Sequence, residues 1–256
     1  MNPPPVARRS LAVLLPLSLL IGCGSSTSTS TQAAPASATP SGGTVTVFAA
    51  ASLKKAFTAE GKAFAATHPG LTVTFSFAGS QVLVAQLQQG APADVLATAD
   101  LATITSVRSR LVSDPQVLAH NQLALLVAKG NPGKVTRLTD LARPGVKVVL
   151  AGPTVPAGKA AAKALKAAGV RVTPVSLEDA VTGVVSKVRL GEADAGIAYV
   201  SDLNGVDVLG TPLPGTTTTL GIAAVRGGSA AGQTFVQFLL SAPGQAILEA
   251  AKFQPA

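Results

Sequence analysis

The sequence has few of the residues on which most metal sites and enzyme active sites depend. Its 256 residues include one cysteine, two histidines, one tyrosine and no tryptophan. A lone cysteine, Cys23, excludes a disulfide within the chain. Two histidines far apart, with no cysteine after Cys23, do not suggest a zinc or iron site. We therefore expect no resident cofactor.

Motifs for nucleotide binding and for hydrolysis are also missing. The sequence has no P-loop and no G-x-G-x-x-G, so any use of ATP would belong to partner subunits. It has no G-x-S-x-G, and neither His68, in a His-Pro-Gly turn, nor His120, ahead of an expected strand, suggests the base of a Ser-His-Asp hydrolase. The S-x-x-K pattern from Ser52 to Lys55 leaves a serine hydrolase of the β-lactamase type as an alternative, although K-T-G is absent.

Charged residues are scarce as well, at 12% of the chain, and the net charge is +8. The basic residues are spread over expected helices, and no cluster of them alternates with aromatic side chains. Nucleic-acid binders normally carry a basic stripe or a recognisable motif. We therefore expect solvated helix faces and no nucleic-acid partner.

The start of the chain does not have the composition of a folded domain. Residues 1–22 have the pattern of a secretory signal, with Arg8 and Arg9 ahead of an apolar run that is short and interrupted by proline. The four residues that end at Cys23 resemble the bacterial lipobox, which predicts a lipid anchor on that cysteine; a plain secretory signal is the alternative. Residues 23–43 are rich in Ser, Thr, Pro and Ala and predict a flexible tether. The folded part would then work outside the cytoplasm, anchored to the outer face of the cell membrane.

From Thr44 onward, short β-branched runs alternate with amphipathic helices. This alternation predicts an α/β fold with parallel sheets and right-handed crossovers. Strands are expected at residues 45–48, 71–77, 94–97, 123–128, 146–150, 197–200 and 221–225. Helices are expected at residues 52–67, 80–89, 101–110, 138–141, 156–168, 180–190, 231–240 and 244–250.

The strand–helix pattern restarts beyond residue 121, which favours two lobes. We expect a first lobe of residues 44–121 plus 220–256 and a second lobe of residues 122–219. The strands near 123–128 and 221–225 would cross between the lobes as a hinge. We expect the protein to be a monomer.

Six pieces of the sequence resemble, in order, the molybdate-binding proteins of ABC transporters. They extend over about residues 44–253: Ala49–Leu53, Phe77–Leu83, Pro92–Asp100, Val155–Ala161, Glu178–Val181 and Gly191–Asp202. The resemblance implies a type II periplasmic-binding-protein fold, in which two α/β lobes close on the ligand. It also implies capture of molybdate, and of tungstate, for delivery to the permease and ATPase subunits of an ABC importer.

The resemblance also implies which residues bind the ion. The serines of the first two strand–helix junctions fall on Ser52 and Ser80, and the tyrosine hydroxyl falls on Tyr199. Two backbone amides fall on Ala157 and Val181. Relatives typically have a pair of serines at the second junction, whereas this chain supplies Ser80 alone. Molybdenum would be held as molybdate by these same residues.

The residues support this assignment on physical grounds. A tetrahedral dianion accepts hydrogen bonds and donates none, so its site has to consist of donors. Helix amino termini offer unpaired N–H groups and the positive end of the helix dipole. Four of the five residues lie at or near an expected helix start, where Ser52 and Ser80 could instead be ordinary caps. A receptor for another tetrahedral oxyanion, such as sulfate, is the alternative within this class.

Overall fold

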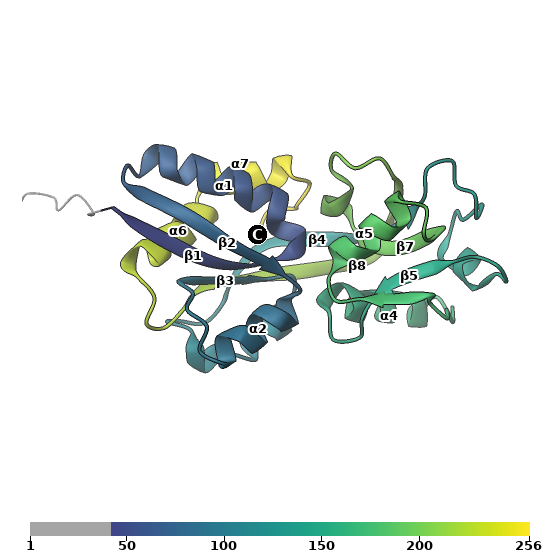
Figure 1. The fold of residues 1–256 in the computed structure, drawn as a ribbon, viewed down its shortest axis with the longest axis horizontal. Helices are drawn as coiled ribbons and strands as arrows, with labels where there is room; N and C mark the ends of the chain where they lie inside the picture. The colour runs from purple at the N-terminus through teal and green to yellow at the C-terminus, as the bar shows by residue number, and fades with distance from the viewer. Residues whose placement is uncertain (1–41) are drawn as a thin grey trace, which may run out of the picture. The chain divides into compact units, whose positions relative to one another are not determined.

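The computed structural model describes residues 42–256, and Figure 1 shows their fold. The expected signal sequence, the lipid anchor on Cys23 and nearly all of the expected tether lie outside the described residues. The first strand begins at Gly43, so it includes the last residue of the expected tether. Among the described residues, no helix has the length and apolar character needed to cross a membrane.

The described residues form one eight-stranded sheet in the order β2-β1-β3-β8-β4-β7-β5-β6. The strands are β1 (Gly43–Ala50), β2 (Leu71–Ala78), β3 (Val95–Thr98), β4 (Gln116–Val127), β5 (Val148–Ala151), β6 (Ser176–Glu178), β7 (Ala195–Tyr199) and β8 (Leu209–Ala224). The α-helices are α1 (Lys54–Thr67), α2 (Ser80–Gln88), α3 (Leu101–Thr105), α4 (Pro156–Ala167), α5 (Val181–Arg189), α6 (Ala230–Leu240) and α7 (Ala242–Ala250). Short 3₁₀ helices are η1 (Ala51–Leu53), η2 (Arg108–Arg110), η3 (Leu138–Ala142) and η4 (Val200–Leu203).

The α/β class is as expected, but the sheet is mixed and not parallel. Strands β1, β2 and β3 are parallel to one another, as are β5, β6 and β7. Strand β8 is antiparallel to both β3 and β4, and β4 is antiparallel to β7. Alternation of strands and helices predicts parallel pairing only for consecutive units. It carries no information on β4 and β8, which lie in the middle of the sheet and join its two parallel groups.

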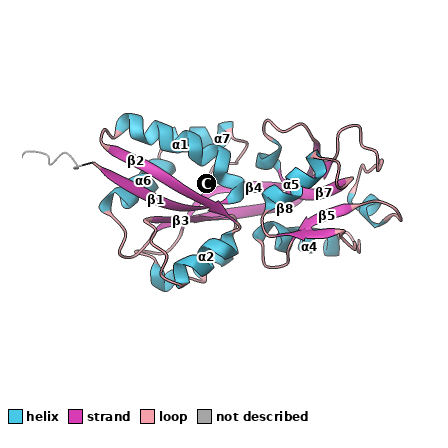
Figure 2. Ribbon diagram, in the orientation of Figure 1, coloured by secondary structure: helices cyan, strands magenta, loops and turns pink. Residues whose placement is uncertain are grey.

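Strands β4 and β8 are much longer than the sequence predicts, and Figure 2 shows them passing through the middle of the structure. The expected strands at 123–128 and 221–225 are only their ends. Residues 212–219 contain two prolines and a glycine, which is the composition of a loop. Residues 213–216 do break the ladder, since β4 pairs with Thr217 at Gln122 and with Pro212 at Ala124. The pairing resumes on both sides, so the whole segment is one interrupted strand.

The first half consists of β1, β2 and β3 with the helices around them, namely η1, α1, α2, α3, α6 and α7. We call those around β5, β6 and β7 the second half, namely α4, α5 and η4. In the first half, α1 and α7 lie over one face of the sheet and α2 over the other (Figure 1). Phe57 and Phe64 of α1 pack edge-on against Phe235 of α6, and all three are fully buried. Aromatic packing of this kind fixes α1 over the sheet and thereby fixes where its amino end lies.

Helix boundaries depart from expectation at two places. The expected helix at 52–67 begins with the 3₁₀ turn η1, and α1 starts only at Lys54. The expected helix at 101–110 divides into α3 and η2. The remaining long helices begin and end within two residues of the predicted bounds. Pro156 is a strong local signal for a helix start, and the glycines that follow helices are strong signals for their ends.

Candidate functional site

One small cavity between the two halves is lined by all five expected ion-binding residues. Ser52 and Ser80 come from the first half, and Ala157, Val181 and Tyr199 from the second. Each is at most 8% exposed. Segments more than 100 residues apart in the sequence therefore meet at this point.

The first half supplies two strand–helix junctions. Strand β1 ends at Ala50, and η1 places Ser52 directly beyond it. Strand β2 is parallel to β1 and in register with it, Ala50 opposite Ala78, so Ser80 at the start of α2 lies beside Ser52. Parallel neighbours deliver their carboxyl ends to one edge of a sheet, which is where ligands bind in open α/β folds.

The second half supplies two helix starts and a strand end. Helix α4 begins at Pro156, whose missing N–H costs nothing at that position, and the amide of Ala157 follows it. Helix α5 begins at Val181. Tyr199 is the last residue of β7.

The hydroxyls of Ser52 and Tyr199 are buried and have no hydrogen-bond partner among the described residues. Burial raises the pKa of Tyr199, so its hydroxyl keeps its proton and can donate. Ser80 differs, because its Oγ accepts the Ala99 amide at 3.1 Å and its own proton stays free to donate elsewhere. A buried polar group without a partner costs about 1–3 kcal/mol, and two in one cavity indicate a ligand that satisfies both.

The helix starts at the cavity also lack caps. No side chain caps η1, α2, α4 or α5. By contrast, Asp100 caps α3 through the Thr103 amide at 2.6 Å, and Ser229 caps α6 through the Gly232 amide at 3.2 Å. Ser52 is therefore no ordinary cap in this structure. The uncapped N–H groups are free to bind an acceptor in the cavity.

No charged side chain lines the cavity, so every group it offers is a neutral hydroxyl or amide. Asp202 does not line the cavity, and its carboxylate accepts a hydrogen bond from the Tyr199 amide at 3.0 Å. Burial raises the pKa of Asp202 to about 7. Within residues 42–256, no group of three histidine, cysteine, aspartate or glutamate side chains could hold a bare metal ion.

The cavity has a volume of about 10 Å³. A cavity needs at least about 10–15 Å³ of this kind of volume to hold one water molecule. A tetrahedral oxyanion is larger than this volume.

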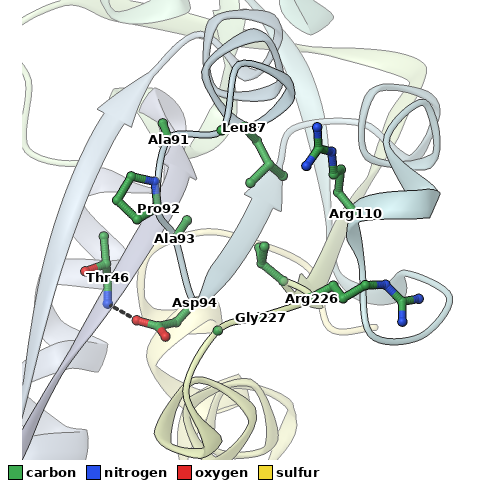
Figure 3. Close-up of a pocket in the computed structure, with 12 residues that line it drawn as sticks. Thr46, Leu87, Ala91, Pro92, Ala93, Asp94, Arg110, Arg226 and Gly227 are labelled. Carbon is green, nitrogen blue, oxygen red and sulfur yellow. Dashed lines mark hydrogen bonds between the residues drawn. The ribbon is translucent and has the colours of Figure 1, made fainter. Parts of the chain in front are cut away.

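A larger pocket of about 230 Å³ lies around Asp94, Arg110 and Arg226, and Figure 3 shows it. Its polar groups are already paired: the Asp94 carboxylate accepts the amides of Thr46 at 2.7 Å and Ser229 at 2.6 Å. Both arginines donate to backbone carbonyls, Arg110 at 3.2 Å and Arg226 at 3.0 Å. This pocket is larger than the cavity between the two halves, but its polar groups are paired, whereas the unpaired donors favour the smaller cavity.

Sequence reasoning missed the contacts that surround the cavity. Gln81 donates to the Asp179 carbonyl at 2.9 Å, and Lys55 donates to the Asn204 carbonyl at 3.1 Å and side chain at 3.0 Å. Each joins the first half to the second. These partners are 98 and 149 positions apart, and no local pattern in the sequence pairs them.

The S-x-x-K pattern does not form a catalytic pair in this structure. The ammonium of Lys55 donates to Asn204, and the Ser52 Oγ has no hydrogen-bond partner among the described residues. A serine nucleophile needs a base within hydrogen-bond reach. The arrangement provides donors for an anion and no activated nucleophile.

Known proteins resemble this chain over most of its length. The family model for bacterial extracellular solute-binding proteins matches residues 45–254. The molybdate-binding protein ModA of Mycobacterium tuberculosis (strain H37Rv) is 41% identical over 248 residues, which cover 91% of this chain and 92% of that protein. ModA of Escherichia coli (strain K12) is 33% identical over 184 residues, which cover 66% of this chain and 71% of that protein.

The fold has a solved counterpart as well. The Azotobacter vinelandii periplasmic molybdate-binding protein matches with a TM-score of 0.74 and 20% identity, over 83% of this chain and 99% of that one. The resemblance to molybdate-binding proteins and the periplasmic-binding-protein fold expected from it are thus confirmed. The chain belongs to the family of bacterial extracellular solute-binding proteins.

Proposed function

We propose that this protein binds molybdate, and tungstate, and delivers the ion to the permease and ATPase subunits of an ABC importer. It would act as a binding subunit and not as an enzyme. The observation that carries the proposal is the pair of buried hydroxyls, Ser52 and Tyr199, which have no hydrogen-bond partner within residues 42–256 and meet uncapped helix starts in an uncharged cavity. The named function of the mycobacterial relative supports the choice of ion.

The donors suffice for binding without any charged residue. Three hydroxyls and the nearby amides give about six hydrogen bonds to a charged acceptor, worth roughly 1.5–3 kcal/mol each. The gross gain of about 10–20 kcal/mol exceeds the association cost, which is on the order of 4–15 kcal/mol.

Neutral donors also select among oxyanions. Hydrogen phosphate carries a proton that would face a donor in such a site and would leave one hydrogen bond unmade. A fully deprotonated dianion accepts from every side. We therefore propose that phosphate binds much more weakly than molybdate.

We propose that binding couples to closure of two lobes, residues 44–121 plus 220–256 and residues 122–219. An ion that bridges Ser52 and Ser80 on one side and Ala157, Val181 and Tyr199 on the other favours the closed form. The small cavity supports this proposal, because the ion needs an open form in order to enter.

The experiment is thermal unfolding of the purified protein with sodium molybdate, tungstate, sulfate and phosphate in turn. A selective ligand at 100 times its dissociation constant stabilises the folded state by about 2.7 kcal/mol. We expect molybdate and tungstate to raise the melting temperature and phosphate to leave it unchanged. No shift with either heavier ion would refute the proposal.

Sulfate is the second candidate, because it too is a tetrahedral dianion that accepts hydrogen bonds and donates none. A larger shift with sulfate than with molybdate in the same experiment would establish it. The serine hydrolase alternative is tested by acylation of Ser52 with a β-lactam probe, and we expect no adduct.

We propose further that Cys23 carries the lipid that anchors the monomeric protein to the outer face of the cell membrane. The position of Cys23 at the end of an apolar run supports this proposal. Replacement Cys23→Ser is expected to move the protein from the membrane fraction to the soluble fraction. Equal membrane retention of the variant would contradict the anchor.

A further inference from the structure

Three residues of the first half touch the second half beside the cavity without presenting a side chain to the ion. We call these three interactions the cross-cleft contacts: Gly79 against the Asp179 carbonyl, Gln81 with the same carbonyl, and Lys55 with Asn204. We propose that they set the affinity of the site by holding the cleft closed. The inference rests on the proposed function and adds to it the residues that control closure.

Gly79 makes the closest approach. A Cβ at this position would overlap the backbone oxygen of Asp179, which cannot move aside as a side chain can. The conformation of Gly79, φ −59° and ψ 137°, is one that any residue adopts. A Cβ would also meet the flexible side chain of Gln81, but the fixed obstacle is the Asp179 carbonyl, so glycine is needed here for the close approach of the two halves.

Gln81 lies two residues further on and uses the same acceptor. Its Nε2 donates to the Asp179 carbonyl at 2.9 Å. Asp179 is two residues ahead of Val181, and Gln81 directly follows Ser80, so this contact is adjacent to two proposed ion-binding residues. A movement that brings Gln81 to Asp179 therefore also brings Ser80 and Val181 toward the same ion.

Lys55 makes the corresponding contact from α1. Its ammonium donates to the carbonyl and the side chain of Asn204, and the Asn204 side chain in turn donates to the Ala250 carbonyl of α7 at 3.4 Å. Asn204 of the second half is thus held by two helices of the first. Lys55 follows Ser52 by three residues, so this contact adjoins the cavity as well.

The energetic argument is one of populations. If only the closed form binds tightly, the apparent dissociation constant equals the intrinsic one divided by the fraction of closed protein. A contact present only in the closed form raises that fraction. Loss of one such hydrogen bond is expected to weaken binding about 2- to 10-fold, and an obstruction at Gly79 is expected to weaken it more.

The test compares Gly79→Ala, Gln81→Ala and Lys55→Ala with two matched controls. Lys54→Ala removes the same charge from the neighbouring position, and Gln88→Ala removes the same side chain from the exposed end of α2; neither makes a cross-cleft contact. Calorimetry with sodium molybdate gives the affinity. Hydrogen–deuterium exchange of the ligand-free protein gives the protection of residues 79–83 and 179–183.

We expect weaker molybdate binding in the order Gly79→Ala, then Gln81→Ala and Lys55→Ala, with both controls within 2-fold of the wild type. Exchange should be faster at 79–83 and 179–183 and unchanged in the remaining peptides, which a general loss of stability would not produce. Wild-type protection together with wild-type affinity in all three variants would overturn the inference. If the wild type itself binds no molybdate, the proposed function fails, and the exchange comparison alone decides whether these contacts hold the cleft closed.

Discussion

Ser52 and Tyr199 reach the same cavity from different halves of the molecule, and neither hydroxyl has a hydrogen-bond partner in the part of the chain that the structure describes. Ser52 follows β1, and Tyr199 is the last residue of β7. The ligand-free protein is destabilised by both groups, and a bound ion would relieve both. Binding and stability should therefore respond in opposite directions when either hydroxyl is removed.

For Tyr199→Phe we expect molybdate affinity to fall about 10-fold or more, since one hydrogen bond to the charged ion is lost. The stability of the ligand-free protein should be unchanged or slightly higher. Calorimetry and chemical denaturation measure the two effects. Thr103→Val is a matched control, because the Thr103 hydroxyl is also buried without a partner but lies outside the cavity; an equal loss of affinity there would contradict the assignment.

Ser52→Ala and Ser80→Ala should differ in stability although both weaken binding. The Ser80 Oγ accepts the Ala99 amide, so its removal leaves a buried N–H unpaired and should cost about 1–3 kcal/mol. The Ser52 Oγ accepts no hydrogen bond among the described residues, so its removal should leave the stability unchanged or slightly higher. Urea denaturation of the two ligand-free variants checks the difference, and equal stabilities would show that the Ala99 contact is unimportant.

Asp202 should make molybdate affinity depend on pH. Burial raises the pKa of Asp202 to about 7, so the carboxyl is neutral at pH 6 and charged at pH 8. The new charge lies next to Tyr199 and repels a dianion, which should weaken binding about 10-fold between these pH values. Calorimetry at pH 6 and pH 8 should show this loss in the wild type and not in Asp202→Asn.

Asp207→Asn serves as the control for that experiment. The Asp207 carboxylate is exposed and pairs with Lys129 at 2.9 Å, away from the cavity. The Asp207→Asn variant should keep the wild-type dependence of molybdate affinity on pH. If Asp202→Asn kept it too, the titrating group would lie elsewhere.

Glu60 should make the stability of the protein fall as the pH rises. It is fully buried in α1, and neither of its carboxylate oxygens has a hydrogen-bond partner among residues 42–256. Burial raises its pKa from 4.5 to about 8. Between these values the folded state keeps a proton that the unfolded state releases, so the free energy of unfolding decreases with increasing pH. Glu60→Met should remove this decrease and stabilise the protein by about 2–4 kcal/mol at pH 9.

Chemical denaturation from pH 5 to pH 9 measures the effect. Glu249→Met changes an exposed glutamate of α7 and should leave the pH profile as it is in the wild type. A profile for Glu60→Met parallel to that of the wild type would show that Glu60 does not titrate in this range.

Local signals in the sequence predict most elements of this fold. Pro156 and Gly169 bound α4, and the Ser80 junction and Gly90 bound α2, within a residue or two. The lengths of β4 and β8 could not be predicted, because they depend on pairing between segments about 100 residues apart. The stretch from Leu213 to Thr216 does have the composition of a loop, yet the sheet continues on both sides of it.

The candidate site shows the same division. Strand–helix junctions and the family resemblance together indicated five residues, and all five are among those that line the cavity. The requirement for glycine at position 79 comes from a carbonyl 100 positions away and leaves no local trace. The missing partners of Ser52 and Tyr199 likewise become visible only once the cavity is assembled.

The interrupted ladder between β4 and β8 has a thermodynamic consequence. Both strands belong to the sheet on either side of the interruption. Within the interruption, the Gln122 side chain donates to the Leu213 carbonyl, and the Leu123 amide donates to the Thr216 hydroxyl. Melting of either half would leave β4 and β8 without their partners on that side of the sheet. Heat should therefore denature residues 42–256 in a single cooperative transition. An ion bound in the cavity should then protect the strand farthest from it against thermal unfolding as much as the nearest strand.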